Sequence, residues 1–359
     1  MSFNKEERKR LKTRIVSAIG ADEQLTGFIP QEFAKKNSVS VQTVYRYLKQ
    51  LENEKEITVS RDGRRNEYKL FNKVNSFRFE LSNITEDGVW RKHIHPLLED
   101  IPEIAYKICN YAFTEMLNNA IDHSGGTHVD IYTMSNLYFT VILIHDNGVG
   151  IFTKIAEAMN FEEKRFAVLE LAKGKFTTDP ESHTGEGIFF SSKATAVFAI
   201  FSDDLLFQPL NHPDSKPDSM LSNYNHSILD ENTAFLKEGT TIMFIVLHNQ
   251  QQTLKEIFDK YTGAPEDYGF TKTVIPVKLL EFGDDAALFT SRSQAKRLLA
   301  RFERFEHIEL DFTNIQDIGQ GFADEIFRVF ANQHPTVSLT ATHCNEQVQY
   351  MINRVKNPR

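Results

Sequence analysis

The chain has 359 residues, 41% of them hydrophobic, and a formal net charge of −8. This length predicts two or three domains, with enough apolar residues for packed cores. Only two cysteines occur, Cys109 and Cys344, and no apolar run approaches the roughly 20 residues of a membrane helix, so the composition argues against a disulfide-rich or membrane-spanning protein and predicts a cytoplasmic one.

The charge is distributed unevenly along the chain. Residues 1–75 contain 16 lysines and arginines against 10 aspartates and glutamates, a net of +6, which leaves a net of −14 for the remainder. A basic first segment in an otherwise acidic chain predicts that this segment alone binds a polyanion.

Three helices are predicted in the basic segment. Apolar residues at helical spacing predict the first over residues 5–19, and we expect Gly20 to end it. Pro30 opens a short second helix, because proline fits the first turn. Residues 41–51 predict the third helix, whose apolar stripe we expect to be buried: Val41, Val44, Leu48 and Leu51.

A basic hairpin follows these helices. A strand over 57–60 leads through the turn Asp62-Gly63 into a return strand near 68–70. Helix, turn, helix and basic hairpin together resemble a winged helix-turn-helix DNA-binding domain, with 40–51 as recognition helix and 61–65 as wing. The resemblance implies that the third helix meets base edges and the wing meets phosphates, through Gln42, Thr43, Tyr45, Arg46, Arg61, Arg64 and Arg65. A basic helical domain used for protein contact is the alternative.

Two polar motifs farther along suggest a nucleotide site. Glu115 and Asn119 are four residues apart, so on a helix they share one face, where a carboxylate and an amide oxygen can orient water and bind Mg²⁺. Asp146 stands where an apolar run of strand type ends, and it can accept a hydrogen bond from an exocyclic amine. Gly148 and Gly150 then let the backbone approach a flat ligand.

Two further motifs complete the series. The segment His183–Ser192 places two glycines before an apolar stretch that predicts a helix start, whose free amides favour phosphate. The segment Glu238-Gly239-Thr240-Thr241 leads into an apolar strand. Any one of these motifs is a weak signal, whereas four in this order predict a nucleotide site.

The four motifs resemble the N, G1, G2 and G3 boxes of the GHKL ATPase superfamily, and over residues 85–250 they are most like the anti-sigma-factor serine kinases. The resemblance implies an ATP and Mg²⁺ site in which Glu115 is the catalytic, water-orienting or base residue, Asn119 is the metal ligand and Asp146 reads adenine. It also implies cofactor contacts from Asp122, Gly148, Gly150, Lys175, Thr184, Gly185, Gly187, Ile188 and Thr240.

Residues 151–184 lie between the second and third motifs, where this superfamily keeps its mobile ATP lid. Lys173 or Lys175 could reach the terminal phosphates of the nucleotide. A solvated helix face predicts the same two lysines, and both interpretations stay open at this point.

Alternating strands and helices begin near Phe270, with one strand predicted over 274–280, and indicate a small α/β layer domain. The segments Leu310–Ile318 and Phe322–Glu325 resemble the STAS family of anti-sigma antagonist domains. Members of that family carry a phosphorylatable serine at the start of the helix after this strand, but here the place falls near Gln320-Gly321, which has no hydroxyl. We therefore expect docking or dimerisation and not phosphorylation in cis.

Together these patterns predict an α+β protein of three domains. They are a winged helix over 1–74, a GHKL α/β sandwich (Bergerat) ATP-binding domain over 75–262, and a STAS-like domain over 263–359.

Three functions fit this arrangement. The first is a regulator in which Mg-ATP binding or slow hydrolysis controls binding to DNA or to a regulatory protein partner, with self-association through the STAS-like domain as a further option. The second is a serine/threonine protein kinase that acts on a separate protein. The third is a non-enzymatic interaction protein whose ATP site is structural.

Overall fold

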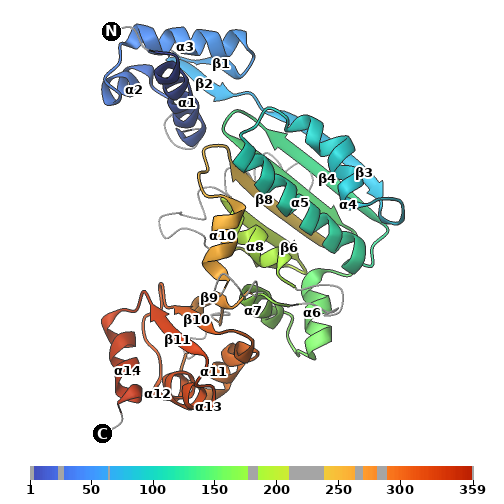
Figure 1. Cartoon of the computed structure of the whole chain (residues 1–359), viewed down its shortest axis with the longest axis vertical. Helices are drawn as coiled ribbons and strands as arrows, with labels where there is room; N and C mark the ends of the chain where they lie inside the picture. The colour runs from blue at the N-terminus through green and yellow to red at the C-terminus, as the bar shows by residue number, and fades with distance from the viewer. Residues whose placement is uncertain are drawn as a thin grey trace. The chain divides into compact units, whose positions relative to one another are not determined.

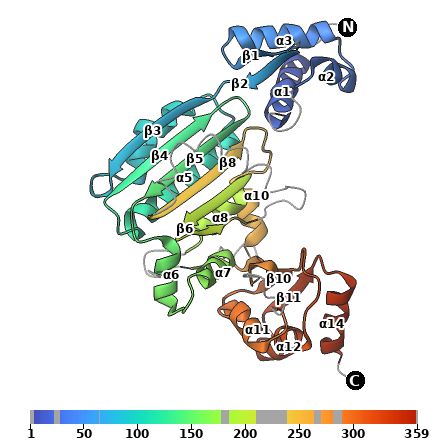
Figure 2. The same ribbon diagram turned by 180° about the vertical axis from the view of Figure 1, so that it is seen from behind.

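The computed structural model describes residues 4–22, 28–63, 65–176, 185–209, 238–262, 270–280 and 289–357. The chain forms two compact units (Figures 1 and 2). The first is Met1–Gly150 with Ala194–Gln252, and the second is Ile151–Lys193 with Thr253–Arg359, so the chain crosses between the units three times. The domain boundaries predicted after residues 74 and 262 divide the chain into consecutive segments, whereas these two units are each made of two separate segments. The predicted boundaries stay predictions.

The first unit begins with three helices and a hairpin, which we call the head. Its elements are α1 (Lys5–Asp22), α2 (Pro30–Lys36), α3 (Val41–Asn53) and the antiparallel strands β1 (Ile57–Asp62) and β2 (Arg65–Leu70). Asn4 and Glu7 exchange two hydrogen bonds of 2.8 Å between side chain and backbone at the start of α1. The Ser40 hydroxyl accepts from the backbone N–H of Thr43 at 3.1 Å and begins α3. Local capping thus sets where two of the three helices begin.

The apolar stripe predicted for α3 forms part of the core of the head. Val44, Leu48 and Leu51 are buried as predicted, while Val41 is only partly buried at the edge of the same core. The remaining buried members come from α1, from α2 with the residues just before it, from Tyr47 of α3, and from the hairpin: Leu11, Ile15, Val16, Ile19, Phe28, Phe33, Ala34, Tyr47, Ile57, Tyr68 and Leu70.

The prediction that Gly20 ends the first helix was wrong, because α1 continues to Asp22. Gly20 is buried, and a Cβ added there would lie 2.2 Å from Cδ1 of Tyr138. This glycine therefore permits close packing against an aromatic ring and does not act as a helix terminator.

A six-stranded sheet forms the rest of the first unit. Its strand order is β3-β4-β5-β8-β6-β7, and every neighbouring pair is antiparallel. The strands are β3 (Lys73–Glu80), β4 (His128–Ser135), β5 (Phe139–Asp146), β6 (Val197–Ser202), β7 (Leu205–Phe207) and β8 (Thr240–Leu247). All residues of β5 are buried, which explains its continuous apolar sequence.

Helix α5 (Glu103–His123) lies along one face of this sheet (Figure 1). Its apolar side packs against β5 and β8 with Ile108, Ala112, Phe113, Met116 and Leu117 among its buried residues. Four short helical segments precede it: η1 (Leu81–Asn83), α4 (Glu86–Val89), η2 (Trp90–Ile94) and η3 (His95–Leu97).

The second unit combines a three-stranded parallel sheet with helices. Its strand order is β11-β10-β9. The segment between the two parts of the first unit supplies α6 (Ile151–Met159), α7 (Arg165–Lys173) and α8 (Gly187–Ala194). The rest are α10 (Leu254–Tyr261), β9 (Lys272–Pro276), η6 (Val277–Leu280), α11 (Arg292–Leu299), η7 (Phe302–Arg304), β10 (His307–Asp311), α12 (Gln320–Asp324), η8 (Glu325–Phe330), α13 (Ala331–Gln333), β11 (Ser338–Thr342) and α14 (Glu346–Lys356).

The predicted alternation of strands and helices after residue 270 is confirmed, with one correction. The strand predicted over 274–280 ends at Pro276 and continues as the 3₁₀ turn η6. Proline has no N–H to offer a neighbouring strand, so its position at the end of β9 is the physical reason. Within the described ranges, no helix combines the length and the apolar character that crossing a bilayer requires.

Candidate functional site

Asp146 and Thr240 lie opposite each other at the ends of neighbouring strands. The register of β5 and β8 pairs them directly, although they belong to motifs far apart in the sequence. Both are buried, with 5% and 6% of their surface exposed. The structure therefore brings a carboxylate and a hydroxyl from two predicted motifs to the same edge of the sheet.

The turn after Asp146 rests on the end of α5. The Asp146 carboxylate accepts a hydrogen bond from the N–H of Gly148 at 2.9 Å, which closes a tight turn. A Cβ on Gly148 would lie 2.2 Å from the carbonyl oxygen of Ser124, and the N–H of Val149 donates to that same oxygen at 3.0 Å. The first and second motifs thus meet through backbone contacts.

Two more glycines are packed closely around this turn. Gly150 has φ +94°, and a Cβ there would be 2.8 Å from the Asp203 carboxylate. Gly239 has φ +74°, and its Cβ would be 1.9 Å from the carbonyl oxygen of Asp146. The Ser202 hydroxyl donates to the Gly239 carbonyl at 2.8 Å. Sequence reasoning missed Gly239 and Ser202 as site residues, although Gly239 directly precedes Thr240 in the fourth motif.

Asn147 was also missed, and it fixes the turn from the other side. Its amide oxygen accepts from the N–H of Thr127 at 2.8 Å and of His128 at 3.0 Å, while its amide nitrogen donates to the Thr127 hydroxyl at 3.0 Å. These bonds tie the turn to the beginning of β4. A lone asparagine before a glycine gives no sequence signal for such a role.

The first motif lies on α5 as predicted. Glu115 and Asn119 are half-buried and share a face by their spacing, and Asp122 is exposed near the end of the helix. His145 precedes Asp146 on β5 and shares a hydrogen bond of 2.9 Å with the Thr241 hydroxyl. Burial lowers the pKa of His145, which favours the neutral form of its ring.

The remaining predicted cofactor residues belong to the second unit and are described with it. Gly185 has φ +70°, and a Cβ there would be 2.4 Å from the carbonyl oxygen of Phe176. Gly187 is the first residue of α8, and Ile188 follows it, half-buried. Thr184 lies outside the described residues. A phosphate-binding role for these residues stays a prediction.

Lys175 contacts the C-terminal part of the second unit. Its ammonium donates to the carbonyl oxygen of Arg304 at 3.1 Å and lies 5.5 Å and 5.0 Å from the ring centres of Phe270 and Phe305. The guanidinium of Arg301 donates to the Lys175 carbonyl at 2.6 Å. Its predicted role as a phosphate contact stays a prediction.

Lys173 is 1% exposed, so the interpretation of a solvated helix face is wrong for this residue. Its ammonium pairs with the Glu170 carboxylate and donates to the carbonyl oxygens of Ala300 at 2.9 Å and Arg297 at 3.3 Å. Arg301 donates to the same carboxylate at 3.3 Å. Burial lowers the pKa of Lys173, and the charge of Glu170 opposes this shift. Buried charges therefore join α7 to the end of α11 and the residues that follow it.

The polar face predicted for the third helix is present on α3. Gln42, Tyr45 and Arg46 are exposed, while Thr43 is half-buried. The Thr43 hydroxyl lies 2.9 Å from that of Ser40, so part of its hydrogen-bonding capacity belongs to the helix cap.

The hairpin carries the other predicted DNA contacts. Arg61 and Arg65 are exposed near its tip, and Arg64 lies outside the described residues. Gly63 has φ +58°, as the predicted turn requires.

In the second unit, Asp324 connects two helical segments. Its carboxylate accepts from Arg328 at 2.5 and 2.7 Å and from Arg292 of α11 at 3.0 Å. The hydrogen bond from Arg328 is the main reason why the pKa of Asp324 is lowered. This arrangement orients α11 against the helix after β10.

A comparison with known families identifies the region that contains Asp324. Residues 294–349 match the STAS-like domain of unknown function (DUF4325). The predicted STAS-like domain at the C-terminus of a chain of mixed helices and strands is thereby confirmed. A search of curated proteins found no match.

The STAS-like domain has a crowded helix start near Gln320-Gly321, the place that the sequence showed to lack a hydroxyl. There α12 begins at Gln320, after Gly319. A Cβ on Gly319 would lie 2.7 Å from Cα of Thr290, and one on Gly321 would lie 3.1 Å from the Thr290 carbonyl oxygen. The two glycines let the backbone pack against Thr290, and the expected docking role stays a prediction.

Proposed function

We propose that this protein is an ATP-binding regulator with a GHKL-type nucleotide site, a winged-helix DNA-binding head and a STAS-like domain that binds a partner protein or a second copy. The pairing of Asp146 with Thr240, beside the Gly148 turn that rests on α5, carries this proposal. It unites residues from three of the four motifs in one unit.

The chemistry of this edge of the sheet suits a purine. An aspartate carboxylate accepts a hydrogen bond from an exocyclic amine, and the hydroxyl of Thr240 can assist on the same side. Cβ atoms added at Gly148 and Gly239 would clash with the backbone of Ser124 and Asp146, so these glycines hold the turn closely beside the proposed purine-binding carboxylate.

Binding of Mg²⁺ would depend on the phosphates of the bound nucleotide. Among the described residues, no group of three or more His, Cys, Asp or Glu side chains is arranged to hold a metal ion. Mg²⁺ commonly keeps several waters and binds to one or two protein oxygens together with substrate phosphates, so Asn119 suffices as the protein ligand.

Charge supports the assignment of DNA to the head. This segment is basic on an otherwise acidic chain, and its third helix exposes Gln42 and Arg46. ATP then acts as a ligand with different affinity for two conformations, and the coupling of the nucleotide site to DNA or partner binding is reciprocal.

A protein kinase is the second candidate, because the half-buried carboxylate of Glu115 can accept the proton of a serine hydroxyl as well as orient water. Radiolabelled ATP separates the two functions. Label transferred to a partner protein supports the kinase, whereas ATP binding without transferred label supports the regulator.

Thermal unfolding with and without Mg-ATP tests the proposal. ATP at 100 times its dissociation constant should stabilise the protein by about 2.7 kcal/mol. Asp146→Asn should abolish this shift, because the amide presents a donor where an acceptor is needed. Asp100→Asn, the same change at an exposed position, is the matched control and should keep the shift. Equal shifts in the two variants would contradict the adenine assignment.

A further inference from the structure

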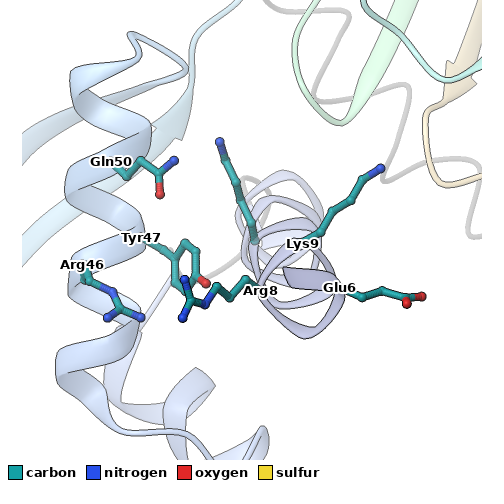
Figure 3. Close-up of a pocket in the computed structure, with 7 residues that line it drawn as sticks. Glu6, Arg8, Lys9, Arg46, Tyr47 and Gln50 are labelled. Atoms are coloured by element: carbon teal, nitrogen blue, oxygen red, sulfur yellow. The ribbon is translucent and has the colours of Figure 1, made fainter. Parts of the chain in front are cut away.

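A groove runs between α1 and α3 in the head. It has a volume of about 940 Å³ and is lined by Glu6, Arg8, Lys9, Lys12, Arg46, Tyr47 and Gln50. Figure 3 shows the side chains of Arg8 and Arg46 extending toward each other from the two helices, beside Tyr47. None of the α1 residues was predicted to contact DNA.

The groove is strongly basic. Four of its lining side chains are cations and only Glu6 is acidic. The Glu6 carboxylate is bound by Arg10 at 3.0 Å, which offsets its negative charge. Lys12 pairs with Glu54 at 2.6 Å, and Arg8, Lys9 and Arg46 bring three further positive charges to the groove. Like charges from two helices held this close favour an anion between them.

The shape of the groove favours an extended anion over a single phosphate ion. Arg46 and Gln50 form one wall and lie on the same stripe of α3 as Gln42, because they are spaced by four residues. On the opposite wall, Arg8 and Lys12 are about 6 Å apart along the axis of α1. The groove therefore continues the face of α3 that is proposed to meet base edges.

We infer that the α1–α3 groove holds the sugar-phosphate backbone of one DNA strand, with Arg8 and Lys9 of α1 binding phosphates and Arg46 at the border between backbone and bases. This inference rests on the proposed DNA binding and adds α1 as a third DNA-contacting element beside α3 and the hairpin. Phosphate contacts position a protein on the duplex, so α1 would fix how α3 enters the groove of the DNA.

The test measures binding of the full chain to a fluorescein-labelled duplex of arbitrary sequence at several salt concentrations. The double variant Arg8→Gln/Lys9→Gln should weaken binding on the order of tenfold at low salt. It should also reduce the slope of log affinity against log salt by about 0.9 for each phosphate that the variant no longer neutralises. The matched control is Lys35→Gln/Lys36→Gln, which removes the same charge from the exposed end of α2, outside the groove. Circular dichroism verifies that both variants are folded.

Each outcome decides a separate point. A reduced slope in the α1 variant alone supports the inference. Equal slopes in the two double variants overturn phosphate binding in the groove and leave DNA binding by the head intact. No binding of the duplex by the unaltered protein overturns the proposed DNA function itself. Binding of a polyglutamate peptide in the absence of duplex binding overturns the inference in favour of an acidic protein partner.

Discussion

Gly239 lies against the backbone of Asp146 so closely that a Cβ would be 1.9 Å from the Asp146 carbonyl oxygen. Gly239→Ala must therefore displace β8 from β5 and also place alanine at φ +74°. We expect a loss of unfolding free energy of at least about 3 kcal/mol, the sum of overpacking and left-handed strain, and loss of the ATP-dependent thermal shift.

Gly63→Ala is the matched control for this change. Gly63 has φ +58° but nothing within 4 Å of an added Cβ, so it should cost only the conformational strain, about 1–2 kcal/mol. Trp90 is the chain's single tryptophan and is buried in the first unit, so its fluorescence reports unfolding there. Equal denaturant midpoints for the two alanine variants would contradict the packing argument.

The contact between Gly20 and Tyr138 predicts that the effect of Gly20→Ala on stability depends on whether the Tyr138 ring is present. Alanine is a better helix residue than glycine by about 1 kcal/mol, yet Gly20→Ala should destabilise the first unit by roughly 1–3 kcal/mol, because the new Cβ would overlap the Tyr138 ring. In a Tyr138→Ala background the same change should become neutral or stabilising. Denaturant unfolding of the four proteins measures this coupling, and additive effects would rule out the contact.

The buried ion cluster of the second unit predicts a large effect from one substitution. Lys173→Met leaves the Glu170 carboxylate buried with Arg301 alone, and we expect a loss of about 3 kcal/mol or more. Lys278→Met, at an exposed lysine, should change stability by less than about 0.5 kcal/mol. Circular dichroism follows both, and similar melting for the two variants would contradict a structural role for Lys173.

His248 makes the first unit sensitive to acid. Burial lowers the pKa of His248 to about 4 from its ordinary value near 6.5, so in this range the unfolded chain binds a proton that the folded chain does not. Stability should therefore fall as the pH drops from about 6.5 toward about 4. His248→Gln should reduce this loss by an amount on the order of 2–3 kcal/mol, since one pKa unit corresponds to about 1.4 kcal/mol.

The comparison is the difference in unfolding free energy between pH 7 and pH 4.5, followed by Trp90 fluorescence. Carboxylates titrate equally in both proteins, so the difference between them isolates the histidine. An unchanged pH dependence in His248→Gln would show that its ring is protonated without cost in the folded state.

The sequence allowed most helices and strands to be predicted because they depend on local signals. Apolar periodicity and the proline at position 30 located the helices of the head, and the continuous apolar run of β5 located a buried strand. The segments around Leu310 and Phe322 indicated the STAS-like domain before any comparison.

Features that depend on packing between distant residues could not be read in this way. Gly20 looks like a helix terminator unless the Tyr138 ring beside it is known. Lys173 looks solvated unless Glu170, Arg301 and two carbonyl groups from a segment more than a hundred residues away are placed around it. The basic groove was not predicted, because one of its walls is formed by α1 and the other by α3.

The buried bonds between Lys173 and the carbonyl oxygens of Arg297 and Ala300 also bear on how the chain is made. Residues 151–193 leave the ribosome long before these partners, and until then the ammonium of Lys173 must remain in water. The second unit therefore cannot finish folding during synthesis of the preceding segments, and it closes only after the polypeptide has been translated past residue 300.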